Sequence, residues 1–137
     1  MKISIKRIDD NFNMEATNEE GNSLLMDGSP DIGGHGKGMR PMQMLLCAVG
    51  GCSAIDVILI LKKQKQIIES FEIEVEGERE KIEDYSLFRD ICLHFKIKGK
   101  VDLAKADRAI KLSIEKYCSV SKTLEPTSKI TYKVTVN

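Results

Sequence analysis

The sequence of 137 residues contains no tryptophan and only four phenylalanines and three tyrosines. Proteins that bind single-stranded nucleic acid stack bases on aromatic rings, so this scarcity argues against such a platform. Neither sign of charge predominates, because 21 Lys and Arg balance 21 Asp and Glu. A balanced chain lacks the basic footprint of a nucleic-acid-binding protein. We therefore expect no nucleic-acid partner.

Proline is also scarce, and the chain shows no repeat or low-complexity segment that would mark a linker. The three prolines are scattered, at Pro30, Pro41 and Pro126. A chain of this length usually forms one domain, so we expect a single domain over residues 1–137. The first residues lack a long apolar stretch and a small-residue cleavage site, which favours a cytoplasmic location.

One long apolar run, residues 42–61, is interrupted by only three polar residues, Gln43, Ser53 and Asp56. A run of this length could span a bilayer, but Asp56 would then lie inside the membrane at considerable cost. We expect instead a helix at the centre of a soluble protein and no membrane partner. A helix that is apolar on nearly every face is buried all round, and in so small a chain that burial indicates a second subunit that covers part of the helix.

Alternating apolar and polar residues predict the strands, and helical spacing predicts a second helix. Asp102 is a plausible N-cap for that helix. In the predicted hairpin, Leu87 and Ile91 share the inward face, whereas a row of glutamates faces Lys96 and Lys98 as a solvated surface. The expected order is βββ–α–ββ–α–β, with strands at 2–8, 12–17, 23–26, 71–80, 87–97 and 130–136 and helices at 42–61 and 102–117.

Residues 27–38 form a loop in which five of twelve residues are glycine. Such a loop is either a phosphate cradle or active-site loop, or a flexible connection between sheet and helix. Its glycine spacing fits neither the P-loop nor the dinucleotide-binding fingerprint, so the connection is the favoured interpretation.

The four cysteines, at positions 47, 52, 92 and 118, include no C-x-x-C pair. A thioredoxin-type motif is therefore absent, and a zinc site is only weakly supported. Cys52 lies in the apolar run beside glycines and a serine, where it is either a buried structural thiol or a reactive one. Cys118 follows the second helix beside serines, and the same two interpretations stay open. Cys47 lies on another face of the helix from Cys52, and we expect it in the core.

Three stretches, residues 26–34, 40–57 and 116–121, resemble the osmotically inducible protein C / organic hydroperoxide resistance (OsmC/Ohr) family. The most specific part is an apolar helix that carries Gly-Gly-Cys-Ser-Ala-Ile-Asp-Val, followed 66 positions after its cysteine by the Cys of Tyr-Cys-Ser-Val-Ser. The resemblance covers essentially the whole chain. It is closest to the less characterised OsmC-like branch.

The resemblance implies an α+β subunit with two long central helices packed on antiparallel sheets, in an intertwined homodimer. It also implies thiol-dependent reduction of small organic hydroperoxides in oxidative stress defence, without a cofactor or a metal. Cys52 matches the cysteine that attacks the peroxide, and Cys118 matches the one that resolves the product as a disulfide. A dithiol reductant of the lipoyl or thioredoxin type would then restore both thiols.

Attack on a peroxide requires a thiol with a lowered pKa, and therefore a nearby cation. Arg40 is the first candidate because it begins the segment that carries Cys52, and Arg7 is the second. The well-known hydroperoxide reductases carry a glutamate ten residues before the first cysteine, where this chain has Met42. This departure leaves an alternative: a non-catalytic protein that binds an apolar or electrophilic small molecule at the dimer interface.

Overall fold

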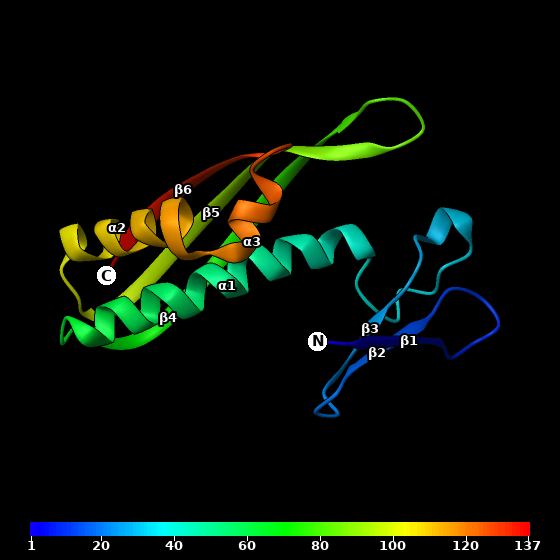
Figure 1. Ribbon diagram of the computed structural model, residues 1–137, viewed down its shortest axis with the longest axis horizontal. Coiled ribbons are helices and arrows are strands. Elements are labelled where there is room, and N and C mark those ends of the chain that lie inside the picture. Colours follow the sequence, from blue (N-terminus) through cyan, green and yellow to red (C-terminus); the bar gives the residue numbers. More distant parts are fainter. The chain divides into compact units, whose positions relative to one another are not determined.

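The computed structural model describes all 137 residues as two compact units, Met1–Leu45 and Leu46–Asn137 (Figure 1). The first unit is built on an antiparallel meander of β1 (Ile3–Arg7), β2 (Met14–Asn18) and β3 (Ser23–Met26). The three predicted N-terminal strands are thus confirmed. Apolar side chains of the sheet, with Met44, line an open hollow of about 380 Å³; they include Ile3, Ile5, Ala16, Leu24 and Met26.

The glycine-rich loop of this unit is organised by the buried carboxylate of Asp27. That carboxylate accepts hydrogen bonds from the backbone N–H groups of Gly28 (2.8 Å), His35 (3.2 Å) and Lys37 (3.0 Å). These donors, with Lys37 foremost, hold the pKa of Asp27 below its ordinary value. A Cβ at Gly34 would lie 1.8 Å from the carbonyl oxygen of Gly28, so the turn requires glycine there. The loop's own aspartate thus occupies these three backbone donors, and the interpretation of the loop as a connection stays a prediction.

The second unit contains most of α1 (Pro41–Lys63) and a three-stranded sheet in the order β4-β5-β6. β4 (Ile67–Lys81) and β5 (Ser86–Lys100) form the predicted antiparallel hairpin, whereas β6 (Lys129–Val136) runs parallel to β5. The α+β class and element order are confirmed, but the expectation of purely antiparallel sheets is wrong for this last pair. A parallel pair needs a crossover connection, and here the helical segments between β5 and β6 supply it.

The core of the second unit lies where α1 and α2 (Leu103–Leu112) cover the same face of this sheet (Figure 1). Its fully buried side chains come from α1, β5 and α2; they include Val49, Val57, Leu61, Ile91, Leu93, Phe95 and Ile110. The alternation predicted for the hairpin is therefore confirmed along most of its length.

One position of the hairpin differs from the prediction. Phe88 is buried in place of Leu87, because the register shifts between Glu78 and Arg79, and Arg89 is the extra residue of β5. A bulge of one residue exchanges the two faces of a strand beyond it. The bulge thus explains why simple alternation predicted that Leu87, rather than Phe88, would be buried.

On the outer face of the hairpin, Lys96 forms ion pairs with Glu72 and Glu74, as the sequence predicted. Lys98 instead lies opposite Ser70. His94, to which the sequence assigned no role, contacts the hydroxyl of Thr135 on β6 at 2.8 Å. This face is a solvated, charge-paired surface.

The second predicted helix is shorter than expected. Asp102 caps α2, and its carboxylate accepts from the backbone N–H of Lys105 at 2.9 Å. A wider π-helical turn, Ser113–Tyr117, follows α2, and the short helix α3 (Ser119–Leu124) comes after it. The chain therefore changes direction at Cys118, between two helical segments.

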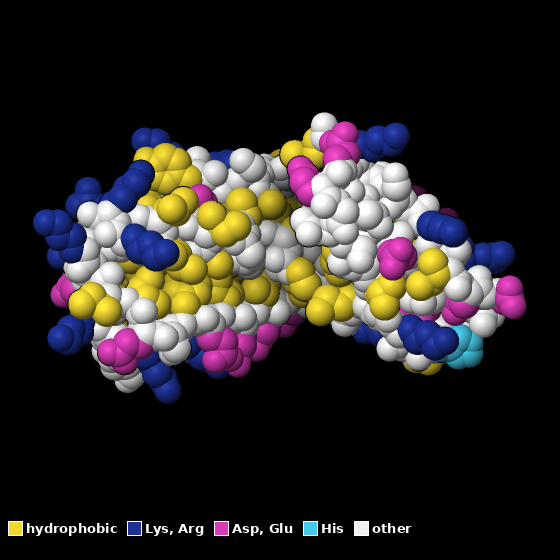
Figure 2. Space-filling model, turned by 90° about the horizontal axis from the view of Figure 1, so that it is seen from below, with side chains coloured by type: hydrophobic (Ala, Val, Ile, Leu, Met, Phe, Trp, Pro, Cys, Tyr) yellow, Lys and Arg dark blue, Asp and Glu magenta, His cyan; other side chains and the backbone are white.

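Within one chain, α1 buries a single stripe of residues rather than its whole surface. The buried positions recur about every four residues, at Val49, Gly50, Ser53, Val57 and Leu61. Ile55 and Leu59 are 63% and 51% exposed, and Figure 2 shows apolar side chains gathered on the same unit. By length and composition alone α1 is also apolar enough to cross a membrane, since its most apolar stretch of 18 residues has a mean hydropathy of 2.4.

Candidate functional site

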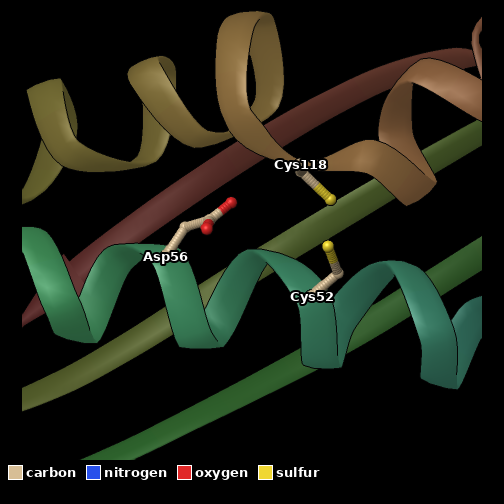
Figure 3. A group of neighbouring side chains, drawn as sticks. All are labelled: Cys52, Asp56 and Cys118. Carbon is tan, nitrogen blue, oxygen red and sulfur yellow. The ribbon is translucent and has the colours of Figure 1, made fainter.

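Cys52 and Cys118 lie side by side in the second unit, with Asp56 next to them. The two sulfur atoms and a carboxylate oxygen of Asp56 lie within 4.8 Å of one another. Figure 3 shows the sulfur of Cys52 pointing from α1 toward that of Cys118, which comes from the turn before α3. The structure thus brings together the two thiols that the sequence selected.

Local structure explains how residues so far apart in sequence meet. Cys52 and Asp56 are four positions apart on α1 and therefore share one side of the helix. A Cβ at Gly50 would lie 2.9 Å from a methyl carbon of Val75, so glycine lets α1 approach β4 closely. The π-helical turn ends where the N–H of Cys118 donates to the carbonyl of Ser113 at 2.7 Å. This turn directs Cys118 toward α1.

Cys118 is fully buried among hydrogen-bond donors. Its sulfur accepts from the hydroxyl of Ser53 and from the backbone N–H of Ser121, both at 3.4 Å. Burial disfavours the thiolate, but the side chain and N–H of Ser121, the hydroxyl of Ser53 and the thiol of Cys52 together lower the pKa of Cys118. Hydrogen bonds to the charged form favour that form, so Cys118 ionises first.

Cys52 is only partly buried and has the opposite tendency. Burial raises its pKa, the thiol of Cys118 and the charge of Asp56 raise it further, and only the backbone of Val120 opposes them. No cation is among these causes. The lowered pKa that peroxide attack requires is therefore not produced by the groups around Cys52 in the single chain.

Asp56 and its neighbours are the part of the site that the sequence analysis missed. The carboxylate of Asp56 accepts a hydrogen bond of 3.0 Å from the hydroxyl of Ser113, in the π-helical turn. Asp56 also adjoins a hollow of about 390 Å³, whose wall includes Leu59, Leu112 and Tyr117. The available signal was an aspartate four residues after a cysteine within an apolar helix.

The two candidate cations lie in the first unit. Arg7 ends β1 and Arg40 directly precedes α1. The backbone N–H of Arg40 donates to the side chain of Gln43 at 2.9 Å. The pKa of Asp31 is lowered mainly by the hydroxyl of Ser29, with a smaller contribution from the charge of Arg40. The role of either arginine at Cys52 stays a prediction.

The other two cysteines lie apart from this site. Cys92 is on the outer face of β5, whereas Cys47 is exposed rather than part of the core. The prediction for Cys47 was wrong because α1 buries the stripe through Val49 and Ser53, and Cys47 lies about 160° from Val49 around the helix. Neither cysteine belongs to the group formed by Cys52, Asp56 and Cys118.

Two neighbouring thiols can be joined by a disulfide, which needs an S–S bond of about 2.05 Å and modest movement of either side chain. Two thiolates and a carboxylate are also ligand types for a thiophilic metal ion. The arrangement is therefore suited to thiol redox chemistry, to metal binding, or to both.

Comparison with known proteins points to one family. Residues 34–133 match the family described as OsmC-like protein. The protein YhfA of Escherichia coli strain K12 is 44% identical over 118 residues, which is 85% of this chain and 84% of YhfA.

Solved structures share the same fold. An OsmC-like protein from Mycoplasma pneumoniae superposes with a TM-score of 0.81 at 22% identity and covers 98% of this chain and 95% of its own. A Legionella pneumophila protein, described as an organic hydroperoxide resistance protein and predicted redox protein, superposes with a TM-score of 0.74 at 17% identity, covering 98% and 97%. At these identities the likeness shows the fold alone.

Proposed function

Because the chain belongs to the OsmC-like protein family, we propose that it is a thiol-dependent peroxidase that reduces organic hydroperoxides through Cys52 and Cys118. The observation that carries this proposal is the proximity of two sulfur atoms that are 66 positions apart in sequence and lie within 4.8 Å. The hydroperoxide as substrate class is supported by the description of the Legionella protein, which has the same fold.

The reaction has two steps. The Cys52 thiolate attacks one peroxide oxygen, the O–O bond breaks, and the departing alkoxide takes a proton to become the alcohol, which leaves Cys52 as a sulfenic acid. The Cys118 thiolate then attacks the sulfur of Cys52 and expels hydroxide, which takes a proton to become water. A disulfide remains, and a dithiol reductant of the lipoyl or thioredoxin type restores both thiols by exchange.

Exposure and hydrogen bonding support this division of roles. Cys52 is partly accessible, whereas Cys118 is fully buried. A thiolate on Cys118, held by Ser53 and Ser121, lies beside the sulfur of Cys52 that it would attack. Cys118 would then act as the resolving thiol of Cys52.

A homodimer would supply what the single chain lacks. Apolar residues of α1 such as Ile55 and Leu59 are exposed, and a second copy of the chain would cover them. An arginine of that second copy, Arg40 first and Arg7 second, would provide the cation that Cys52 needs to lower its pKa. The cytoplasm, where reduced thiols persist, is the expected compartment.

The decisive experiment adds cumene hydroperoxide or tert-butyl hydroperoxide to the reduced protein and follows peroxide loss together with the mass of each cysteine peptide. We expect one equivalent of peroxide to be consumed per chain and a Cys52–Cys118 disulfide to form. Cys52→Ser abolishes the reaction, and Cys118→Ser stops it at the sulfenic acid. Arg40→Gln slows peroxide loss at least about tenfold, because the attacking thiolate loses its cation.

Cys92→Ser is the matched control, since Cys92 lies outside the site and should leave the rate unchanged. If Cys52 stays a thiol while the peroxide persists, the peroxidase proposal fails. An inert protein that copurifies with an apolar ligand would then favour the non-catalytic binding protein.

A further inference from the structure

We propose that Cys52, Cys118 and Asp56 also bind one Zn²⁺ ion in the reduced protein. The two sulfur atoms and a carboxylate oxygen lie within 4.8 Å of one another, with every pair at that distance or less. The site therefore offers three ligand atoms around one point.

The geometry is close to what zinc requires. With Zn–S bonds of about 2.3 Å and tetrahedral angles, the two sulfur atoms must lie about 3.8 Å apart. In the structure the two sulfur atoms lie at most 4.8 Å apart, which is about 1 Å more than this separation. Rotation about side-chain bonds can close that difference. Two thiolates select a soft or borderline ion over Mg²⁺, Ca²⁺ or Mn²⁺, so zinc is the ion that this donor set favours.

The ligands are themselves held by neighbouring hydrogen bonds. Ser113 donates to the carboxylate of Asp56 at 3.0 Å, and Ser53 and the N–H of Ser121 donate to the sulfur of Cys118 at 3.4 Å. Such outer contacts fix the orientation of ligands in metal sites. Here they come from α1, the π-helical turn and α3, so three separate segments hold the ligands in place.

A hollow borders the site on the Asp56 side. Asp56, Leu59 and Tyr117 are among the residues that line this hollow of about 390 Å³, whereas neither cysteine lines it. An ion with three protein ligands keeps its fourth position for water, as zinc does in open sites.

Metal binding and disulfide formation exclude each other, because both use the same two sulfur atoms. The zinc dithiolate, one organic hydroperoxide and two protons would yield the disulfide, the alcohol, water and free Zn²⁺, with the two sulfur atoms oxidised and the peroxide reduced. Zinc would thus protect the thiols until a peroxide displaces it. Only this release step rests on the proposed peroxidase activity; the metal site stands without it.

The test titrates reduced, metal-free protein with Zn²⁺, and with Co²⁺ as a spectroscopic probe. We expect one ion per chain, a thiolate-to-cobalt charge-transfer band, and the strong visible bands of tetrahedral Co²⁺. Cys52→Ser and Cys118→Ser each remove the charge-transfer contribution of one sulfur and abolish tight binding. Asp56→Asn weakens binding, and Ser113→Ala weakens it about 10- to 100-fold while the tetrahedral spectrum is kept.

Cys47→Ser and Cys92→Ser are the matched controls and should bind zinc as the natural sequence does, with far-ultraviolet circular dichroism confirming that every variant is folded. Binding that survives Cys52→Ser and Cys118→Ser, or no stoichiometric binding by the reduced protein, overturns the metal site. Peroxide consumption without zinc binding would support the peroxidase proposal and contradict the metal site. Zinc binding by a chain whose Cys52 does not react with peroxide would support the metal site and contradict the peroxidase proposal.

Discussion

At the scale of single residues, the site shows how neighbours make two identical thiols different. Cys118 is the more deeply buried of the two, yet it has the lowered pKa because donors from Ser53 and Ser121 surround its sulfur. Cys52 is more exposed but has the raised pKa, because burial, Cys118 and Asp56 all oppose its negative charge. Exposure alone would have ranked their acidities in the wrong order.

This difference predicts how Cys52 responds when its partner is removed. In Cys118→Ser, the Cys52 thiolate no longer faces the charge of Cys118, so the pKa of Cys52 falls toward its ordinary value. A larger share of Cys52 is then ionised at pH 8, and alkylation by iodoacetamide becomes faster. Quenched reactions followed by peptide mass spectrometry measure this rate.

Cys47 is the internal reference for that measurement, because it is exposed and lies outside the site, and its alkylation rate should not change. The alkylation rate of Cys52 should also keep rising to a higher pH in the natural sequence than in the variant, because the pKa of Cys52 is higher there. Slower alkylation of Cys52 in Cys118→Ser would contradict the assigned order of ionisation.

The residues of the site were only partly predictable from the sequence. Cys52 and Cys118 were selected because a family resemblance pairs them; composition alone left each undecided. Asp56 and Ser113 were missed because their contact joins positions 57 residues apart, and no local period encodes such a contact. Cys47 was misplaced because the sheet, and not the helix itself, determines which side of an apolar helix is buried.

At the scale of elements, two adjacent glycines of α1 meet different surroundings. A side chain at Gly50 would collide with Val75 on β4, whereas nothing lies within 4 Å of a Cβ at Gly51. The first glycine is therefore required by the contact between helix and sheet. Within one chain, the second has no such requirement.

Paired alanine substitutions test this distinction. Gly50→Ala should destabilise the protein by about 1–3 kcal/mol, because the added methyl group overpacks the contact with Val75. Gly51→Ala should stabilise it by up to about 1 kcal/mol, because alanine favours a helix more than glycine does. Urea unfolding followed by circular dichroism measures both changes.

Each variant serves as the control for the other, since they add the same methyl group one residue apart. Equal effects of the two substitutions would show that the close contact with β4 is not the reason for Gly50. A clear loss of stability in Gly51→Ala would reveal a second surface packed against α1.

Periodicity predicted the elements well and their irregularities poorly. Strands and helices were found because alternation and helical spacing are local signals. The bulge at Arg89, the π-helical turn at 113–117 and the parallel pairing of β6 were not predicted, because each depends on contacts with a distant segment. The π-helical turn matters most, since it gives Cys118 its direction.

At the scale of the whole molecule, the exposed apolar surface predicts self-association. Monomeric proteins rarely expose large continuous apolar areas, yet α1 exposes Ile55 and Leu59. A lysine at position 55 would place a charge in an interface formed by this side of α1. Ile55→Lys should therefore convert a dimer of the natural sequence into a folded monomer, as measured by sedimentation velocity.

Glu78→Gln is the control with the same change in net charge, because it removes one negative charge where Ile55→Lys adds one positive charge. Glu78 lies on the exposed face of β4, and the sedimentation of this variant should equal that of the natural sequence. A natural sequence that sediments as a monomer at micromolar concentration would refute the dimer outright. If Ile55→Lys remains a dimer, the interface does not lie on this side of α1.

The crossover between β5 and β6 has a consequence for the newly made chain. Cys52 leaves the ribosome 66 residues before Cys118, and β6, which pairs with β5, is made after both cysteines. Throughout that interval Cys52 lacks the neighbouring thiol of the folded chain, so an oxidant can carry a sulfenic acid on Cys52 to the irreversible sulfinic acid. The nascent polypeptide is therefore chemically vulnerable until translation delivers Cys118.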